Sequence, residues 1–258
     1  MKKTVSLLLV LLMLLPLSAC GRARERMPLN VFAAASMTET LQEIETKYEA
    51  AHKDVDLVLT LDSSGTLKTQ IEEGAPCDLF ISAAPKQMNQ LEELDMVRTD
   101  SRIDLLENKV ALCVAEGNPA DIHSYDELAQ ALRAGSVLLA IGNSDVPVGQ
   151  YTQKILEYYE LDEAAIASCL TYGSNVKNVT TAVVESTADC GIIYATDAFS
   201  AGLTPVDTAT AEMCGQVIYP AAVLSGAEHG EQAQEFLTYL TGAEASAVFE
   251  AVGFTPLN

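Results

Sequence analysis

The sequence predicts an α/β protein of two lobes, and three observations lead to this fold class. Apolar, strand-like runs alternate with segments of helical spacing along most of the 258 residues. Such alternation is typical of mostly parallel sheets flanked by helices. The length suits two modest lobes better than one wide sheet, and no internal repeat or low-complexity tract interrupts the pattern.

The first nineteen residues are expected to form a secretory signal peptide. Lys2 and Lys3 precede an apolar run at residues 5–15, which is too short to cross a bilayer comfortably. Residues 17–20 read Leu-Ser-Ala-Cys and resemble a bacterial lipobox. This resemblance implies cleavage before Cys20, lipidation of its thiol, and a tether over residues 20–28 that anchors the protein to the extracytoplasmic face of the cell membrane. The alternative is an ordinary signal peptide with a chance cysteine.

Seven apolar runs are expected to be strands, at residues 30–34, 55–61, 78–82, 110–115, 137–141, 191–194 and 217–224. Between them, apolar residues recur at helical spacing, as in residues 37–48. We expect the chain to cross between the lobes near Asn108 and again near Gln216. The first lobe would then comprise residues 29–108 and 217–258, and the second lobe residues 109–216.

The charge of the globular part argues against nucleic acid as a partner. Beyond the tether, ten Lys and Arg stand against thirty-five Asp and Glu, which gives a net charge near −25. A body of this charge repels anions at long range, although salt screens the repulsion beyond about 10 Å. If the ligand is an anion, its attraction must therefore be local.

Five cysteines follow Cys20, an odd number, so at least one has no partner within the chain. No CxxC spacing occurs, and these residues are interpreted mainly as small buried core residues, with a disulfide left open. They are Cys77, Cys113, Cys169, Cys190 and Cys214.

An exported enzyme is the less favoured class of protein. The sequence contains neither a G-x-S-x-G elbow nor an H-E-x-x-H motif, and His52, His123 and His229 are scattered. No clustering of Cys and His suggests a bound metal cation. We therefore expect no catalytic residues and no cofactor.

Four junctions between a strand and a helix share one chemistry. They are Ser36 and residues 63–66, 147–149 and 173–176. Each offers unpaired backbone N–H groups and the positive end of a helix dipole, which bind anions without a cationic side chain. None of the four turns contains Lys or Arg, although Lys68 and Lys177 follow two of them. The alternative for each junction is helix capping, and residues 36–39 fit the S-x-x-E capping box.

Several motifs, in this order, resemble the molybdate-binding proteins of ABC importers. They are VFAAAS at 31–36, DSSGTL at 62–67, GAPCDLFISA at 74–83, GIIY at 191–194, Tyr219-Pro220, and Gly253-Phe254-Thr255. The resemblance covers roughly residues 29–258. It implies the type II fold of periplasmic binding proteins, with the ligand held in a cleft between the lobes. It also implies a monomer that works with an ABC permease.

The resemblance further implies the residues that bind the oxyanion. Ser36 and Ser64 would donate their hydroxyl hydrogens from the first lobe. Val148 and Val176 would donate backbone N–H groups from the second lobe, and the Tyr194 hydroxyl would complete the shell. Val148 stands where the family often has a smaller alanine, which could narrow the pocket.

A site of donors alone selects among tetrahedral anions. Molybdate, tungstate and sulfate are dianions at neutral pH whose oxygens only accept hydrogen bonds. Monohydrogen phosphate carries a proton, and leaving that proton unpaired costs about 1–3 kcal/mol. An inward-facing Asp62 would supply an acceptor and weaken this selection. Molybdate or tungstate is the expected ligand, and another oxyanion such as sulfate is the alternative.

Overall fold

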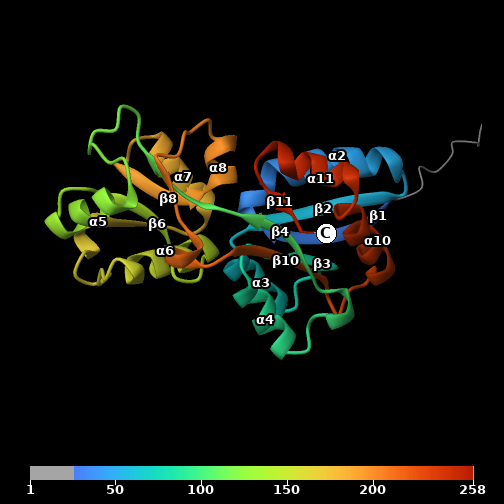
Figure 1. Cartoon of the computed structure of the whole chain (residues 1–258). Coiled ribbons are helices and arrows are strands. Elements are labelled where there is room, and N and C mark those ends of the chain that lie inside the picture. Colours follow the sequence, from blue (N-terminus) through green and yellow to red (C-terminus); the bar gives the residue numbers. More distant parts are fainter. Residues whose placement is uncertain (1–25, 258) are drawn as a thin grey trace, which may run out of the picture.

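The protein forms two lobes that lie side by side and are joined by two segments of chain (Figure 1). The structure, a computed structural model, describes residues 26–257. The expected signal peptide, the expected lipidation site at Cys20 and most of the tether lie outside the described residues. Within the described part of the chain, no helix is both long enough and apolar enough to span a membrane.

The sheet of the first lobe has six strands in the order β11-β4-β10-β3-β1-β2. The strands are β1 (Met27–Ala34), β2 (Val55–Asp62), β3 (Leu79–Ile81), β4 (Ile103–Asn108), β10 (Val217–Val223) and β11 (Thr255–Pro256). Strand β1 pairs in parallel with β2 and β3, and Ala34 lies opposite Asp62. The chain segments that follow β1 and β2 therefore leave the sheet at the same edge.

The sheet of the second lobe has five strands in the order β7-β6-β8-β5-β9. They are β5 (Val110–Val114), β6 (Leu139–Gly142), β7 (Leu170–Gly173), β8 (Cys190–Tyr194) and β9 (Asp207–Thr208). Strand β6 runs parallel to β7 and β8, and Gly142 lies opposite Gly173. The turns after β6 and β7 thus also share one edge.

The prediction of two α/β lobes is confirmed, but the expectation of mostly parallel pairing is wrong in detail. Strand β10 is antiparallel to β3 and β4, and β5 is antiparallel to β8 and β9. The cause is the route of the chain, which passes from the first sheet to the second after Asn108 and returns before Val217. Each strand next to a crossing enters its sheet without a βαβ crossover, so nothing forces it to run parallel.

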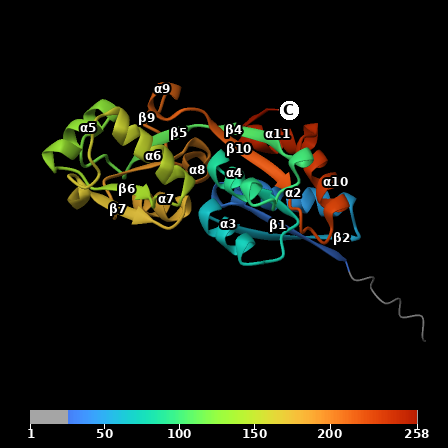
Figure 2. The ribbon, with the colours of Figure 1, turned by 90° about the horizontal axis from the view of Figure 1, so that it is seen from below.

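Helices flank both sheets. In the first lobe they are α2 (Thr38–Ala51), α3 (Ser64–Glu72), α4 (Pro85–Glu93), α10 (Gly230–Leu240) and α11 (Ala243–Ala251). In the second lobe they are α5 (Tyr125–Ala134), α6 (Pro147–Tyr158), α7 (Val176–Val184), α8 (Ala195–Ser200) and α9 (Ala211–Cys214). Short 3-10 turns are η1 (Ala35–Met37), η2 (Thr99–Ser101) and η3 (Ala167–Cys169). Figure 2 shows the two groups of helices from a second direction.

The first sheet has an apolar core on each face, which explains the apolar run at residues 31–34 in the second half of β1. Val31 and Ala33 belong to the large core that continues into the second lobe, while Phe32 belongs to a smaller core with Leu67 of α3 and Leu91 of α4. A strand buried on both faces has no polar alternation. The carboxyl end of β1 is thereby packed on both sides.

The five cysteines of the described chain are all buried and free of disulfides. Burial raises the pKa of the Cys113 and Cys190 thiols to about 12 in each case. Such thiols stay protonated and unreactive at neutral pH. Their role in the described chain is core packing.

Candidate functional site

The four junctions meet in one cavity between the lobes. The cavity is lined by Ala34, Ala35, Ser36, Ser63, Ser64, Ala83, Val146, Pro147, Val148, Val176 and Tyr194. All five residues expected to bind the ligand are among them. No lining residue carries a charged side chain. The cavity is therefore walled by small apolar groups and neutral hydroxyls.

Ser36 does not cap a helix. It lies in η1, helix α2 begins two residues later at Thr38, and the N-cap of α2, Met37, makes no side-chain cap. The Ser36 hydroxyl instead lies 2.9 Å from the Tyr219 hydroxyl. The capping-box alternative for this serine is therefore wrong, and a buried hydroxyl is placed at the cavity wall.

Ser64 does not act as a cap either. The neighbouring Ser63 is the N-cap of α3, and its oxygen accepts a hydrogen bond from the Thr66 N–H at 3.1 Å. The Ser64 oxygen accepts from the backbone N–H of Ala83 at 3.0 Å. Because this bond uses a lone pair and leaves the hydroxyl hydrogen unused, Ser64 can donate into the cavity.

Two valines contribute backbone groups from the second lobe. Pro147 occupies the start of α6, as expected, and Val148 follows it, while Val176 is the first residue of α7. N–H groups at these positions have no acceptor within their own helix. The positive ends of α6 and α7 therefore meet at the cavity. The cap of α7 is Asn175, whose side chain accepts from the Asn178 N–H at 3.1 Å.

Tyr194 closes the cavity from the end of β8. Its side chain is buried, and burial raises its pKa well above the ordinary value of 10.0. Its hydroxyl donates to the Ala83 carbonyl oxygen of the other lobe over a long 3.5 Å. A neutral tyrosine keeps its proton at physiological pH, so this residue can donate to a ligand without adding charge once its long bond to Ala83 is given up.

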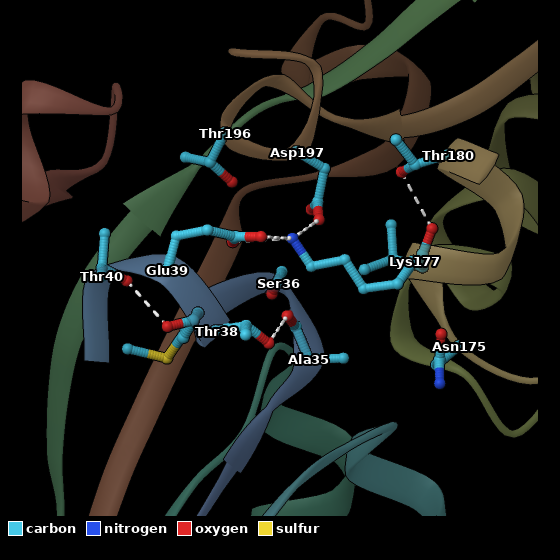
Figure 3. Close-up of polar contacts among 12 residues, drawn as sticks. Ala35, Ser36, Thr38, Glu39, Thr40, Asn175, Lys177, Thr180, Thr196 and Asp197 are labelled. Carbon is cyan, nitrogen blue, oxygen red and sulfur yellow. Dashed lines mark hydrogen bonds and ion pairs between the residues drawn. The ribbon is translucent and has the colours of Figure 1, made fainter. Parts of the chain in front are cut away.

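Lys177, which follows the lining residue Val176, is neutralised by two carboxylates. The Nζ atom of Lys177 lies 2.7 Å from the nearer Glu39 oxygen and 3.1 Å from the Asp197 carboxylate, as Figure 3 shows. Burial lowers the pKa of Lys177, but the two carboxylates outweigh this effect and raise it overall. Burial raises the pKa of Asp197 to about 6, although Lys177 acts in the opposite direction. Lys177 does not line the cavity.

Lys68 and Asp62 also point to other partners. Lys68 pairs with Glu72 one turn further along its own helix, with Nζ 2.7 Å from the carboxylate. Asp62 accepts from the Ser63 N–H at 2.7 Å and from the Asn175 side-chain amide at 3.1 Å. Neither residue lines the cavity, so Asp62 does not supply the acceptor that would favour phosphate.

The lobes are closed on each other. Glu39 and Asp62 of the first lobe contact Lys177 and Asn175 of the second, and Gln87 donates to the Asp145 carbonyl oxygen at 3.3 Å. A Cβ placed on Gly65 would lie closer than 3.0 Å to that same carbonyl oxygen. Gly65 thus permits a close approach that any larger residue would prevent.

Two buried polar residues next to the site were not predicted. Tyr219 contacts Ser36, and Asn108 donates to the Tyr219 hydroxyl at 3.2 Å. Tyr219 was noted only as part of a family motif, and Asn108 only as a crossing point. These contacts join residues 183 and 111 positions apart, so no local pattern could indicate them.

The fold and the cavity together define a two-lobed solute receptor, and comparison with known proteins agrees. The family described as bacterial extracellular solute-binding proteins matches residues 29–255. The chain belongs to this family.

Individual relatives cover most of the chain. YvgL of Bacillus subtilis, which bears the name of an ABC transporter substrate-binding lipoprotein, is 32% identical and covers 90% of this chain and 88% of that protein. The molybdate-binding protein ModA of Haemophilus influenzae is 33% identical, and the match covers 88% of this chain and 89% of that protein. A solved structure named as the substrate binding domain of a molybdenum ABC transporter from Clostridium difficile has a TM-score of 0.66 at 29% identity, with 90% and 99% covered.

Two further matches concern other functions. The sulfate-binding protein SubI of Mycobacterium tuberculosis shares the fold, with a TM-score of 0.74 at 16% identity. The match covers 90% of this chain and 88% of that protein. An aconitate isomerase from a Pseudomonas species is 24% identical, with 89% and 88% covered. The family and the more similar relatives are solute-binding proteins and not enzymes.

Proposed function

We propose that this protein is an extracytoplasmic receptor that binds molybdate or tungstate and delivers it to an ABC permease. One observation carries the proposal: the five residues expected to donate, two from the first lobe and three from the second, line one cavity, and no lining residue has a charged side chain. The molybdate-binding relatives support the choice of ion. Lipidation of Cys20 would hold the receptor at the membrane, and the family to which the chain belongs supports export.

The five expected hydrogen-bond donors account for the affinity expected for the ion and for closure of the lobes around it. Hydrogen bonds to charged groups contribute roughly 1.5–3 kcal/mol each. Five of them, after desolvation and ordering costs, are compatible with the ~8–12 kcal/mol of micromolar to nanomolar binding. Since both lobes contribute donors, the ligand binds the closed state more tightly and shifts the protein towards it. A permease could recognise this closed surface.

Titration calorimetry with molybdate, tungstate, sulfate and phosphate tests the proposal. We expect tight binding of the first two ions and much weaker binding of phosphate, because no carboxylate lines the cavity to accept the phosphate proton. Sulfate is smaller, and tight binding of sulfate alone would favour the sulfate alternative. An absence of heat with both molybdate and tungstate would defeat the proposal.

Ser36→Ala is expected to weaken molybdate binding by about 1–3 kcal/mol, because a buried acceptor oxygen of the ligand loses its donor. The measurement is the molybdate dissociation constant of the variant. Ser174→Ala is a matched control, since the exposed Ser174 hydroxyl donates to Asn178 outside the cavity. An unchanged affinity in Ser36→Ala would remove this serine from the site.

Glu39→Gln is expected to weaken molybdate binding by up to about fivefold at low salt, the upper end for a partly exposed ion pair of roughly 0.2–1 kcal/mol. The pair between Glu39 and Lys177 joins the two lobes, so we expect it to form only when they close. High salt should reduce the effect. Glu72→Gln, which breaks a pair within α3, is the control. Equal effects of the two variants at low salt would contradict a role in closure.

A further inference from the structure

A chain of buried polar groups connects the first crossing between the lobes with Ser36. Asn108 ends β4, its side-chain amide nitrogen lies 3.2 Å from the Tyr219 hydroxyl, and that hydroxyl lies 2.9 Å from the Ser36 hydroxyl. The three residues are at most 5% exposed. Water therefore competes little for these bonds, and each of these buried polar groups needs a hydrogen-bond partner.

The orientation of the Asn108 amide is fixed by the backbone. Its Oδ1 atom accepts a hydrogen bond from the N–H of Lys109 at 2.8 Å. A nitrogen in that position would face a donor, so the opposite assignment is excluded. The Nδ2 group, which only donates, therefore faces Tyr219 and also Thr196, whose Oγ1 atom lies 2.9 Å away.

This assignment favours one direction for the bond between Tyr219 and Ser36, in which Tyr219 donates. The Tyr219 oxygen accepts from Asn108, so its own single hydrogen is left to donate. Burial raises the pKa of Tyr219 well above its ordinary value, which keeps that hydrogen in place. When Tyr219 donates to the Ser36 oxygen, the Ser36 hydrogen is released for a bond into the cavity.

We propose that Asn108 and Tyr219 are positioning residues that fix the Ser36 hydroxyl as a donor to the bound oxyanion. The proposal rests on the proposed function. It makes Ser36 equivalent to Ser64, whose oxygen is likewise occupied by a donor, the Ala83 N–H. Each serine oxygen then has one lone pair already occupied and its hydrogen directed to the cavity, so the arrangement favours anions whose oxygens only accept. Successive hydrogen bonds of this kind strengthen each other.

The same amide connects the two lobes. Thr196, the second acceptor of Asn108, follows Tyr194 by two residues and belongs to the second lobe. Asn108 itself lies where the chain leaves the first lobe. At the crossing, the Asn108 side chain therefore donates to Tyr219, which contacts Ser36, and to Thr196, which follows Tyr194.

The experiment is a double-mutant cycle with sodium molybdate as the titrated ligand. We expect Tyr219→Phe to weaken binding about three- to tenfold, the change that one hydrogen bond of ordinary net strength produces. In a Ser36→Ala background the same change should have little further effect, because Tyr219 acts through Ser36. A merely structural role of Tyr219 would give losses that add.

Three comparisons make the result decisive. Tyr151→Phe is the matched control, because the buried Tyr151 also packs near Tyr194, with ring centroids 6.3 Å apart, but lies outside the chain from Asn108 to Ser36. Tyr194 is the other hydroxyl beside Tyr219, so coupling of Tyr219→Phe to Tyr194→Phe instead of Ser36→Ala would overturn the proposal. If Tyr219→Phe does not fold, Asn108→Ala takes its place in the same cycle.

Failure of this inference can be told from failure of the proposed function. If the unchanged protein gives no heat with molybdate, the proposed function fails. If the unchanged protein binds molybdate and Tyr219→Phe binds it equally well, or with additive losses, the positioning role fails while the function stands. Thermal unfolding of each variant without molybdate shows whether a loss of binding reflects a loss of folding.

Discussion

Gly65→Ala should abolish tight molybdate binding while the protein remains folded. In the closed structure, a Cβ at this position lies closer than 3.0 Å to the Asp145 carbonyl oxygen of the opposite lobe. The lobes would be held apart, and the three donors of the second lobe would lose contact with the ion. Each such bond contributes roughly 1.5–3 kcal/mol, so we expect affinity to fall by at least about a hundredfold.

The stability of Gly65→Ala without molybdate should not fall together with its affinity. Gly65 lies in α3, where alanine is a better helix former than glycine by up to about 1 kcal/mol. Thermal unfolding without molybdate should therefore be unchanged or slightly raised, while the stabilisation added by molybdate disappears. Gly226→Ala is the control, because a Cβ there meets nothing within 4 Å. Normal binding by Gly65→Ala would show that the ligand does not require this closed state.

Lys177→Met should destabilise the folded protein at pH 8 by about 3 kcal/mol, the lower end of the range for breaking a buried pair. The Asp197 side chain is fully buried, with a relative exposure of 0%, and Lys177 is the cation that compensates it. Without this cation, a buried carboxylate must either remain charged in an apolar environment or take up a proton. Denaturant unfolding measures the change.

The effect should depend on pH with a definite sign. Burial raises the pKa of Asp197 to about 6 in the folded protein, from 3.8 when unfolded. The folded state therefore binds more protons than the unfolded state between these values, and this group's contribution to stability falls as the pH rises through that window. Removing Lys177 raises the pKa further, so the loss should be smaller at pH 5 than at pH 8.

A surface ion pair provides the control for this prediction. Lys68→Met breaks the pair with Glu72 on α3 and should change stability by about 0.5 kcal/mol or less at both pH values. If Lys177→Met were equally mild, or if its effect did not depend on pH, Asp197 would not be a charged group that needs this lysine.

The sequence indicates the fold where local pattern and burial agree. The apolar run of β1 and the helical spacing of Leu41, Ile44 and Tyr48 both correspond to elements of the structure. Strand β4 was not predicted, because Asp104 and Glu107 interrupt its apolar residues. The antiparallel insertion of β10 was not predicted either, since alternation of strands and helices does not specify the order of strands in a sheet.

The candidate site, like the fold, was predicted in its local features but not in its long-range contacts. The four junctions were predicted because each is a local feature, a strand end followed by a helix start. Whether a serine caps its helix or faces the cavity depends on partners far away in the chain, such as Ala83 for Ser64. The pairing of Lys177 with Glu39, 138 residues apart, is equally invisible to local pattern. Long-range contacts therefore decide which polar groups remain for the ligand.

The neutral character of the site is tested most directly by a crystal structure with molybdate, in which anomalous scattering locates the molybdenum atom. Our account predicts the ion in the cavity, with its oxygens accepting from Ser36, Ser64, Tyr194 and the backbone N–H groups of Val148 and Val176, while Lys177 remains paired with Glu39 and Asp197. An ion in contact with the ammonium group of Lys177, or with any other lysine or arginine, would contradict it.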